Sequence, residues 1–162
     1  MSEDRDFDAI IVGGGLAGLS AGIVLANAGL GVMLVERGDE CGMKNMTGGR
    51  LYGHSLEKII PGFAEEAPIE RKVTHEKISL MNEKGSLDIG FNSLKLKDAE
   101  EEASYTVLRA KFDSWLASKA EEAGVEMVTG IRVDTCLVDE NGAVYGIEAD
   151  GDEITSDVVI LA

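Results

Sequence analysis

The sequence has few of the residues that would hold a fold together covalently or coordinate a metal. Its 162 residues include 2 Cys and 2 Pro. The cysteines, Cys41 and Cys136, are too few for a disulfide framework, a four-ligand zinc site or an iron–sulfur cluster. The 20 Gly follow no three-residue period, which excludes a collagen-like chain. We therefore predict no metal site, and the scarcity of cysteine fits a reducing compartment.

Basic residues are scarce as well, since 15 Lys and Arg stand against 30 Asp and Glu and the net charge is −15. A nucleic-acid binder needs clustered Lys and Arg to neutralise phosphates, so this class is excluded. Hydrophobic residues make up 44% of the chain, which is too many for intrinsic disorder. The length suffices to bury a core and is typical of one domain.

Charge is missing altogether from residues 9–35, a run long enough for a membrane helix. Glycines interrupt this run repeatedly, and its N-terminal flank is acidic, whereas a signal peptide needs a basic one. Its apolar pattern also changes period along the run. It predicts a buried strand over 9–12, a helix over 16–28 that Gly29 caps, and a second strand over 32–35. We therefore expect a βαβ unit.

The first strand and the helix are joined by Gly13-Gly14-Gly15-Leu16-Ala17-Gly18, a G-x-G-x-x-G motif. Gly13 permits a sharp turn, Gly15 lets a pyrophosphate approach the backbone, and Gly18 allows the helix to pack closely on the strand. The helix N-terminus then offers N–H groups and a positive dipole end to the phosphates. A lone glycine motif more often merely joins two elements, but here all parts of the fingerprint occur in order. The pattern favours dinucleotide binding.

Glu36 ends the second strand about 20 residues beyond the glycines, where an acid binds a ribose hydroxyl. A carboxylate at this position disfavours NADP, whose 2′-phosphate it would repel. The fingerprint itself leaves FAD and NAD open. Two later turn signals, Asn141-Gly142 and Asp150-Gly151, predict a three-stranded antiparallel meander. An NAD dehydrogenase would instead continue into a second βαβ half.

Weaker patterns describe the rest of the chain. Residues 41–52 predict a loop, 55–60 a short helix, 77–91 a β-hairpin and 97–104 an acidic loop. In the amphipathic helix predicted over 110–123, Phe112 belongs to the apolar stripe and Asp113 to the polar face. Strands are predicted over 125–128 and, buried, over 158–161. Because the chain stops on an apolar strand at Ala162, we expect a piece of a longer protein.

The order of these elements resembles the glutathione-reductase-type FAD domain. The segments 44–56, 60–63, 74–77 and 105–116, above all the Thr-Gly-Gly-Arg block at 47–50, are similar to the FixC family of electron-transfer flavoprotein–quinone oxidoreductase-like proteins. The resemblance implies an α/β fold: an FAD-binding Rossmann-like domain with a parallel sheet and a three-stranded antiparallel meander, and the beginning of a second, β-rich domain. It divides the chain into an N-terminal part of the FAD-binding domain (1–72), a hairpin insertion toward a substrate or quinone domain (73–104) and the continued FAD-binding domain (105–162).

The resemblance also implies a function. It is that of a cytoplasmic FAD-dependent oxidoreductase, with peripheral contact to the inner face of the cytoplasmic membrane. Electrons would pass from an electron-transfer flavoprotein toward quinone through a ferredoxin-like protein. Within the same fold, the alternatives are an FAD-dependent reductase of prenyl chains and an aromatic monooxygenase. An alternative of another class is a nucleotide-binding fragment without turnover.

Finally, the resemblance implies a set of cofactor-binding residues, while no catalytic residue is assigned. Glu36 would bind the adenosine ribose, Arg37 and Val133 would lie near adenine, and Arg109 would reach toward the pyrophosphate. The loop 44–50 is expected near the isoalloxazine, where either Lys44 or Arg50 would stabilise the anionic reduced flavin. The full set is Gly13, Gly14, Gly15, Leu16, Ala17, Gly18, Glu36, Arg37, Lys44, Asn45, Gly48, Gly49, Arg50, Arg109 and Val133.

Overall fold

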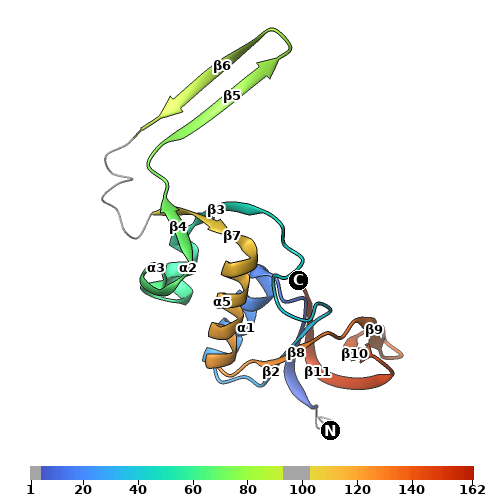
Figure 1. Ribbon diagram of the computed structural model, residues 1–162. Helices are drawn as coiled ribbons and strands as arrows, with labels where there is room; N and C mark the ends of the chain where they lie inside the picture. Colours follow the sequence, from blue (N-terminus) through green and yellow to red (C-terminus); the bar gives the residue numbers. More distant parts are fainter. Residues whose placement is uncertain (1–4, 93–102) are drawn as a thin grey trace. The chain divides into compact units, whose positions relative to one another are not determined.

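The computed structural model describes residues 5–92 and 103–162, so most of the acidic loop expected at 97–104 lies outside the described residues. The chain divides into two compact units (Figure 1). Unit 1 comprises Met1–Thr47 with Arg109–Ala162, and unit 2 comprises Gly48–Leu108. This geometric division groups residues 48–72 with the hairpin, whereas the resemblance placed them with the FAD-binding part. The assignment of 1–72, 73–104 and 105–162 to functional domains stays a prediction.

Unit 1 is built on a six-stranded sheet in the order β8-β2-β1-β11-β10-β9. Strands β8, β2, β1 and β11 run parallel, whereas β11, β10 and β9 pair antiparallel. Both the βαβ unit and the meander are therefore confirmed. The elements are β1 (Phe7–Val12), α1 (Leu16–Asn27), β2 (Val32–Glu36), α5 (Arg109–Glu122), β8 (Glu126–Thr129), β9 (Val133–Val138), β10 (Val144–Ala149) and β11 (Asp152–Leu161).

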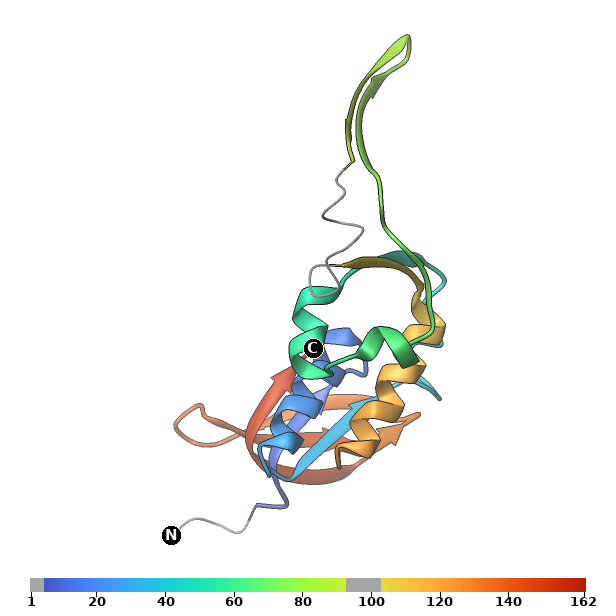
Figure 2. The same cartoon turned by 90° about the vertical axis from the view of Figure 1, so that its left-hand side faces the viewer.

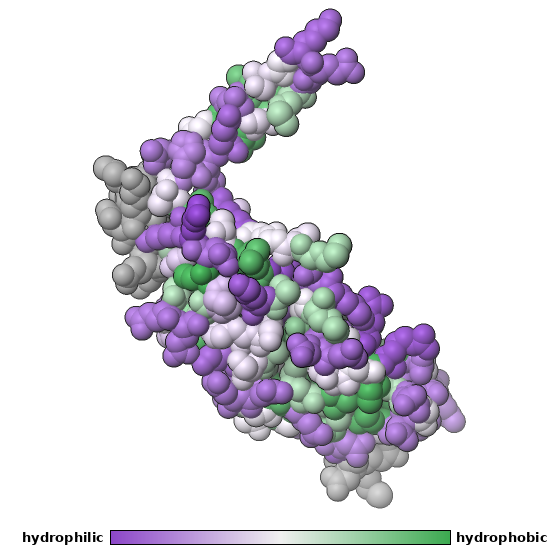
Figure 3. Space-filling view, in the orientation of Figure 1, coloured by the Kyte–Doolittle hydropathy of each residue, from purple (hydrophilic) through white to green (hydrophobic). Residues whose placement is uncertain are grey.

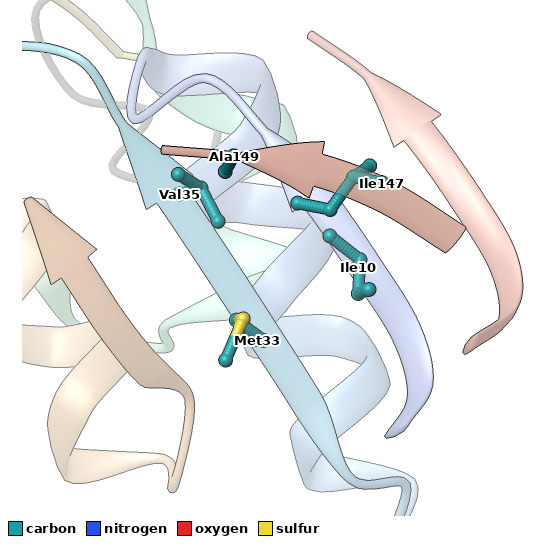
Figure 4. Close-up of a cluster of buried hydrophobic side chains, with 5 residues drawn as sticks. All are labelled: Ile10, Met33, Val35, Ile147 and Ala149. Atoms are coloured by element: carbon teal, nitrogen blue, oxygen red, sulfur yellow. The ribbon is translucent and has the colours of Figure 1, made fainter. Parts of the chain in front are cut away.

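Three layers enclose the core of this unit. Helices α1 and α5 lie side by side on one face of the parallel strands (Figure 2), where α1 packs against β1 and β2. On the other face, Ile147 and Ala149 of the meander pack against Ile10 of β1 and against Met33 and Val35 of β2 (Figure 4). The solid apolar runs of β1 and β2 are thus explained, because both faces of these strands are covered.

The last strand differs from the expectation in two ways. The third meander strand and the closing strand are one continuous element, β11, whose first half pairs antiparallel with β10 and whose second half pairs parallel with β1. The prediction of a buried strand at 158–161 is wrong for Val158 and Leu161, which are 52% and 71% exposed. Helix α1 packs against β1 and β2, which leaves β11 less covered.

Unit 2 holds a three-stranded antiparallel sheet in the order β3-β7-β4, and a separate hairpin. The loop expected over 41–52 is wrong in its second half, since residues 48–52 form a strand. This strand pairs with β7, which lies far along the chain. The two glycines at its start favour a loop when only the local sequence is considered. The elements are β3 (Gly48–Tyr52), α2 (Gly53–Ile59), α3 (Phe63–Glu66), β4 (Ile69–Lys72), β5 (Glu76–Asn82), β6 (Gly85–Phe91) and β7 (Ser104–Leu108).

The predicted hairpin is present as β5 and β6, with Ile78 opposite Ile89 and Leu80 opposite Leu87. These four side chains are each more than half exposed, and green apolar atoms are visible along the hairpin in Figure 3. The alternate positions are polar apart from Met81 and Gly90, and among them Asp88 accepts a hydrogen bond from the Ser79 hydroxyl. The hairpin is therefore amphipathic. Among the helices of the described residues, none is long and apolar enough to cross a membrane.

Candidate dinucleotide-binding site

The turn between β1 and α1 is held in a shape that requires glycine. Gly13 has a φ of +115°, and a Cβ there would collide with the carbonyl oxygen of Ala162. The Gly13 amide donates to the carbonyl of Val35 over 2.8 Å, which ties the turn to the end of β2. A residue with a side chain could adopt this conformation only with strain. The structure thus gives Gly13 the turn-forming role that the sequence predicts.

Gly18 brings the helix against the strand. A Cβ at Gly18 would overlap the Gly13 carbonyl oxygen and would lie 3.1 Å from Cγ2 of Ile11. One turn later, a Cβ at Gly22 would lie 3.2 Å from a methyl carbon of Val125. Small residues at these positions therefore set the distance between α1 and the sheet.

Gly15 differs from these glycines, because a Cβ built on it meets nothing within 4 Å. It is the N-cap residue of α1, and no acidic side chain lies in the first turn. Leu16 and Ala17 follow as the first helical residues. The first N–H groups of a helix have no acceptor within it, so they are available to an anion. Open space thus lies over Gly15 at the positive end of the helix dipole.

Glu36 stands beside the glycine turn. Its Oε2 accepts a hydrogen bond from the Gly14 amide over 2.8 Å, and its Oε1 accepts one from the Gly38 amide over 2.7 Å. A Cβ at Gly14 would lie 3.2 Å from Cβ of Glu36 and would collide with Sγ of Cys41. The carboxylate therefore fixes the turn, and it lies within the same site as the glycines.

A cavity of about 530 Å³ opens over this turn, and no side chain of the described residues fills it. Its lining includes predicted residues from four separate parts of unit 1. Gly13, Gly14 and Gly15 contribute the turn, Glu36 and Arg37 the end of β2, Lys44 and Asn45 the following loop, and Val133 the start of β9. The cavity lies at the carboxyl ends of parallel strands, where open α/β sheets bind their ligands.

The lining also includes residues that sequence reasoning did not select, among them Gly42 and Arg132. Arg132 follows the carboxyl end of β8, and this position is the signal that could have identified it. Its guanidinium pairs with Asp134 over 2.6 Å. The lining thus carries the cations of Arg37, Lys44 and Arg132 beside the carboxylates of Glu36 and Glu40.

Arg109, which was expected to reach toward the pyrophosphate, is engaged by Asp113. Its Nε and an Nη donate to the two carboxylate oxygens over 2.8 and 2.9 Å, as an i,i+4 pair on α5. This bidentate partner raises the pKa of Arg109 above its usual value. Arg109 is absent from the cavity lining, so its role at the cofactor stays a prediction.

Gly48, Gly49 and Arg50 belong to unit 2, and their approach to a cofactor stays a prediction. Arg50 donates to Glu76 over 2.5 Å and to the Ser104 hydroxyl over 3.0 Å, and its guanidinium lies over the Tyr52 ring. The hydrogen bond with Glu76 raises the pKa of Arg50 and lowers that of Glu76. Arg50 thus already has partners within its own unit.

Cys41 lies under the glycine turn as a buried, free thiol. Burial, together with the nearby carboxylates of Glu36, Asp113 and Glu121, raises its pKa to about 11. The thiol therefore stays protonated at neutral pH and is a poor nucleophile. Within residues 5–92 and 103–162, no group of three His, Cys, Asp or Glu side chains is arranged to hold a metal ion.

The residues present suit a dinucleotide cofactor. Open space over Gly15 would receive a diphosphate at the N-terminus of α1, and Glu36 offers carboxylate oxygens for a ribose hydroxyl. Any Cβ at position 15 would project into this same space. The cradle therefore fits the pyrophosphate and ribose of FAD.

The chain matches the family described as FAD binding domain over residues 6–160, and it belongs to that family. FAD is accordingly its cofactor, and the expected α/β fold with its antiparallel meander is confirmed. Within this family, the resemblance to FixC is confirmed by curated relatives. Protein FixC of Salmonella typhi is 56% identical over 162 residues, which are 100% of this chain and 37% of that protein.

A second curated relative carries a functional name. The probable electron transfer flavoprotein-quinone oxidoreductase YdiS of Escherichia coli (strain K12) is 53% identical over 100% of this chain and 37% of its own length. The chain thus spans little more than a third of the length of these relatives.

Solved structures share the fold. A geranylgeranyl bacteriochlorophyll reductase-like protein from Thermoplasma acidophilum has a TM-score of 0.76 and 28% identity, over 96% of this chain and 38% of that chain. The myxobacterial halogenase CndH, a variant of FAD-dependent halogenases, has a TM-score of 0.77 and 24% identity, over 96% of this chain and 37% of its own. The likeness to CndH concerns the fold alone.

Proposed function

We propose that this chain supplies the FAD-binding part of an oxidoreductase that passes electrons from an electron-transfer flavoprotein toward quinone. The observation that carries the proposal is the 53% identity to YdiS, whose name states this activity. The 56% identity to Protein FixC supports it. Bound FAD supplies the redox chemistry, and the chain's own residues bind and orient it.

Within this function, the glycine turn and several residues that line the cavity have proposed parts. Gly13, Gly15 and Gly18 shape the cradle for the pyrophosphate, and the Glu36 carboxylate accepts a hydrogen bond from the ribose. Support comes from the open space over Gly15 and from the 2.8 Å hydrogen bond between the Gly14 amide and Glu36. Arg37 and Val133 line the cavity and would lie near the adenine.

Lys44 is the stronger of the two candidates for a cation near the flavin. It lines the cavity, whereas Arg50 is paired with Glu76 and packed over Tyr52. A cation beside the anionic reduced flavin would stabilise it and raise its reduction potential. Arg50 is then proposed to fasten β3 to the base of the hairpin.

The hairpin insertion, 73–104, is proposed to belong to the substrate or quinone domain of the whole protein. Its support is the apolar face of β5 and β6, on which Ile78, Leu80, Leu87, Ile89 and Phe91 are exposed. An isolated hairpin is marginally stable in water and gains stability when such a face is covered.

A ferredoxin-like protein is proposed as a further partner, as the resemblance to the FixC family implies. The cysteines Cys41 and Cys136 are both free and give no cluster ligand set. An iron–sulfur cluster is proposed to belong to this partner. We propose a cytoplasmic protein in peripheral contact with the inner face of the membrane, where quinone is dissolved.

The test uses the full-length protein loaded with FAD, without oxygen. We expect reduced electron-transfer flavoprotein to bleach the visible flavin absorbance and a soluble quinone analogue to restore it. Reduction by NADPH alone would contradict the proposal and would favour the second candidate. That candidate, an FAD-dependent reductase of prenyl chains, is supported by the 28% identity to the geranylgeranyl reductase-like protein.

Two further outcomes are distinguishable in the same experiment. NADPH oxidation that depends on an aromatic substrate and consumes oxygen would indicate a monooxygenase. Flavin that binds without being reduced by either donor would indicate a nucleotide-binding chain without turnover.

A further inference from the structure

One charged side chain lies deep inside unit 1, where the amphipathic pattern did not place it. Asp113 of α5 was assigned to the polar face of the helix, yet it is 0% exposed. The assignment is wrong because the loop of residues 41–47 covers this face of α5. Burying a carboxylate is costly unless it is paired and hydrogen-bonded. Its partners therefore indicate what it does.

Three donors satisfy the Asp113 carboxylate. Arg109 donates to both oxygens from the preceding helical turn. The side-chain amide of Asn45 donates to Oδ2 over 2.6 Å, across 68 positions of sequence. Asn45 belongs to the loop 41–47 and also lines the dinucleotide cavity. One buried carboxylate thus joins α5 to the wall of the cofactor site.

A second contact fastens the same loop to the same helical turn. Gly42 has a φ of +84°, and a Cβ on it would lie 2.6 Å from Cβ of Asp113 and 3.1 Å from the Ala110 carbonyl oxygen. The backbone N–H of Asn45 donates to the Gly42 carbonyl over 2.8 Å. This hydrogen bond closes a turn between Gly42 and Asn45, two loop residues that contact α5. The loop backbone therefore lies directly on α5, and Gly42 also lines the cavity.

We propose that Asp113 is a positioning residue for the cofactor: it holds the loop 41–47 on α5 and thereby builds the wall of the dinucleotide cavity before FAD arrives. Fixing a binding loop in advance removes its ordering cost from the binding step. This inference rests on the proposed FAD binding and deepens it. It also gives Arg109 a role, since the guanidinium supplies the counter-charge that the buried carboxylate requires.

The decisive comparison exchanges the side chains of Asp113 and Asn45, which are hydrogen-bonded to each other. In D113N the negative charge is lost and an NH2 group replaces one of the two oxygens, so the side chain can no longer accept from all three donors that Asn45 and Arg109 supply. In N45D two carboxylates face each other. In the double variant N45D/D113N, the carboxylate at 45 accepts from the amide at 113, so the tie is reversed and retained. E122Q is the matched control, because Glu122 is an exposed carboxylate on the same helix that pairs with Lys119.

Two measurements are made on the full-length protein after removal of its FAD. The dissociation constant of FAD comes from quenching of flavin fluorescence on titration. Amide hydrogen exchange of residues 42–46, measured without FAD, reports whether the loop is held. We expect D113N and N45D to raise the dissociation constant of FAD at least tenfold, as loss of a hydrogen bond to a charged group predicts. Both variants should also speed amide hydrogen exchange in the loop. The double variant should recover much of the FAD affinity and of the slow exchange in the loop, and E122Q should match the wild type in both.

The outcomes separate this inference from the proposed function. Wild-type exchange and FAD affinity in D113N would overturn the positioning role, as would a double variant no better than either single one. Failure of the wild-type chain to bind FAD would count against the proposed function, while hydrogen exchange would still decide whether Asp113 holds the loop. Should D113N not fold, N45A gives the same exchange test with the helix unchanged.

Discussion

The glycines at 15 and 18 have opposite surroundings, although they belong to one motif. Space over Gly15 is open, whereas a Cβ at Gly18 would overlap backbone. Gly15 has a φ of −84°, which alanine adopts without strain. A side chain at position 15 therefore tests FAD binding, whereas a side chain at position 18 tests the stability of the fold.

We predict that G15A leaves the unfolding free energy of the cofactor-free chain within about 0.5 kcal/mol of wild type and weakens FAD at least about tenfold. G18A should instead destabilise the chain by about 1–3 kcal/mol, because helix and strand must move apart. Urea unfolding and FAD titration measure the two quantities. Equal FAD affinity in G15A would show that the space over Gly15 does not receive the cofactor.

Cys41 gives a pH dependence that belongs to one residue. Its pKa is raised to about 11 by burial and by nearby carboxylates. Because the pKa is higher in the folded state, the protonated thiol contributes to the free energy of unfolding. This contribution is complete below the unfolded pKa of about 8.5 and is lost as the pH rises toward 11.

We therefore expect the stability of the wild-type chain to fall between about pH 8.5 and pH 11 more steeply than that of C41A. Comparing the two by urea unfolding at each pH removes the contributions of tyrosine and lysine, which both chains share. Parallel stability curves would contradict the assigned pKa.

At the scale of elements, helix α5 carries much of the packing of unit 1. Phe112 is fully buried on it, as are Leu116 and Ala120 one and two turns on. We predict that F112A costs about 3–5 kcal/mol of unfolding free energy, because it leaves a cavity that the three-layer core cannot close. Urea unfolding tests this value, with K111A at an exposed position of the same helix as the control. A loss below about 1 kcal/mol would mean that α5 is not packed as described.

The elements that were predicted correctly have local causes. Gly29 and Gly124 adopt positive φ just after α1 and α5. The spacing of apolar residues within β1, α1 and β2 can be recognised from each segment alone. The Glu36 position was found because it lies at a fixed spacing from the glycines. These features need no knowledge of distant contacts.

The elements that were missed depend on distant contacts. Strand β3 exists because it pairs with β7, more than 50 positions later, and β11 is continuous because β1 extends the pairing that β10 begins. Asp113 looks like a surface residue from helical periodicity, and only the loop at Asn45 shows that it is buried. Local sequence contains none of this pairing.

At the scale of the whole molecule, the net charge of −15 opposes compactness through self-repulsion. We predict that added NaCl raises the thermal unfolding midpoint of the chain, with most of the rise complete by about 0.15 M, where the screening length is about 8 Å. Differential scanning fluorimetry in NaCl and in KCl gives the test. A midpoint that falls with salt would indicate that favourable ion pairs dominate.

The central claim is that the glycine turn and Glu36 bind the diphosphate and ribose of FAD, and calorimetric titration with three nucleotides tests it directly. The chain is titrated with FAD, with ADP and with FMN, which lacks the adenosine half. The account predicts that FAD binds, that ADP competes with it, and that FMN binds at least about tenfold more weakly, since it misses the cradle over Gly15 and the carboxylate of Glu36. Equal binding of FMN and FAD, or FAD binding that ADP does not reduce, would contradict it.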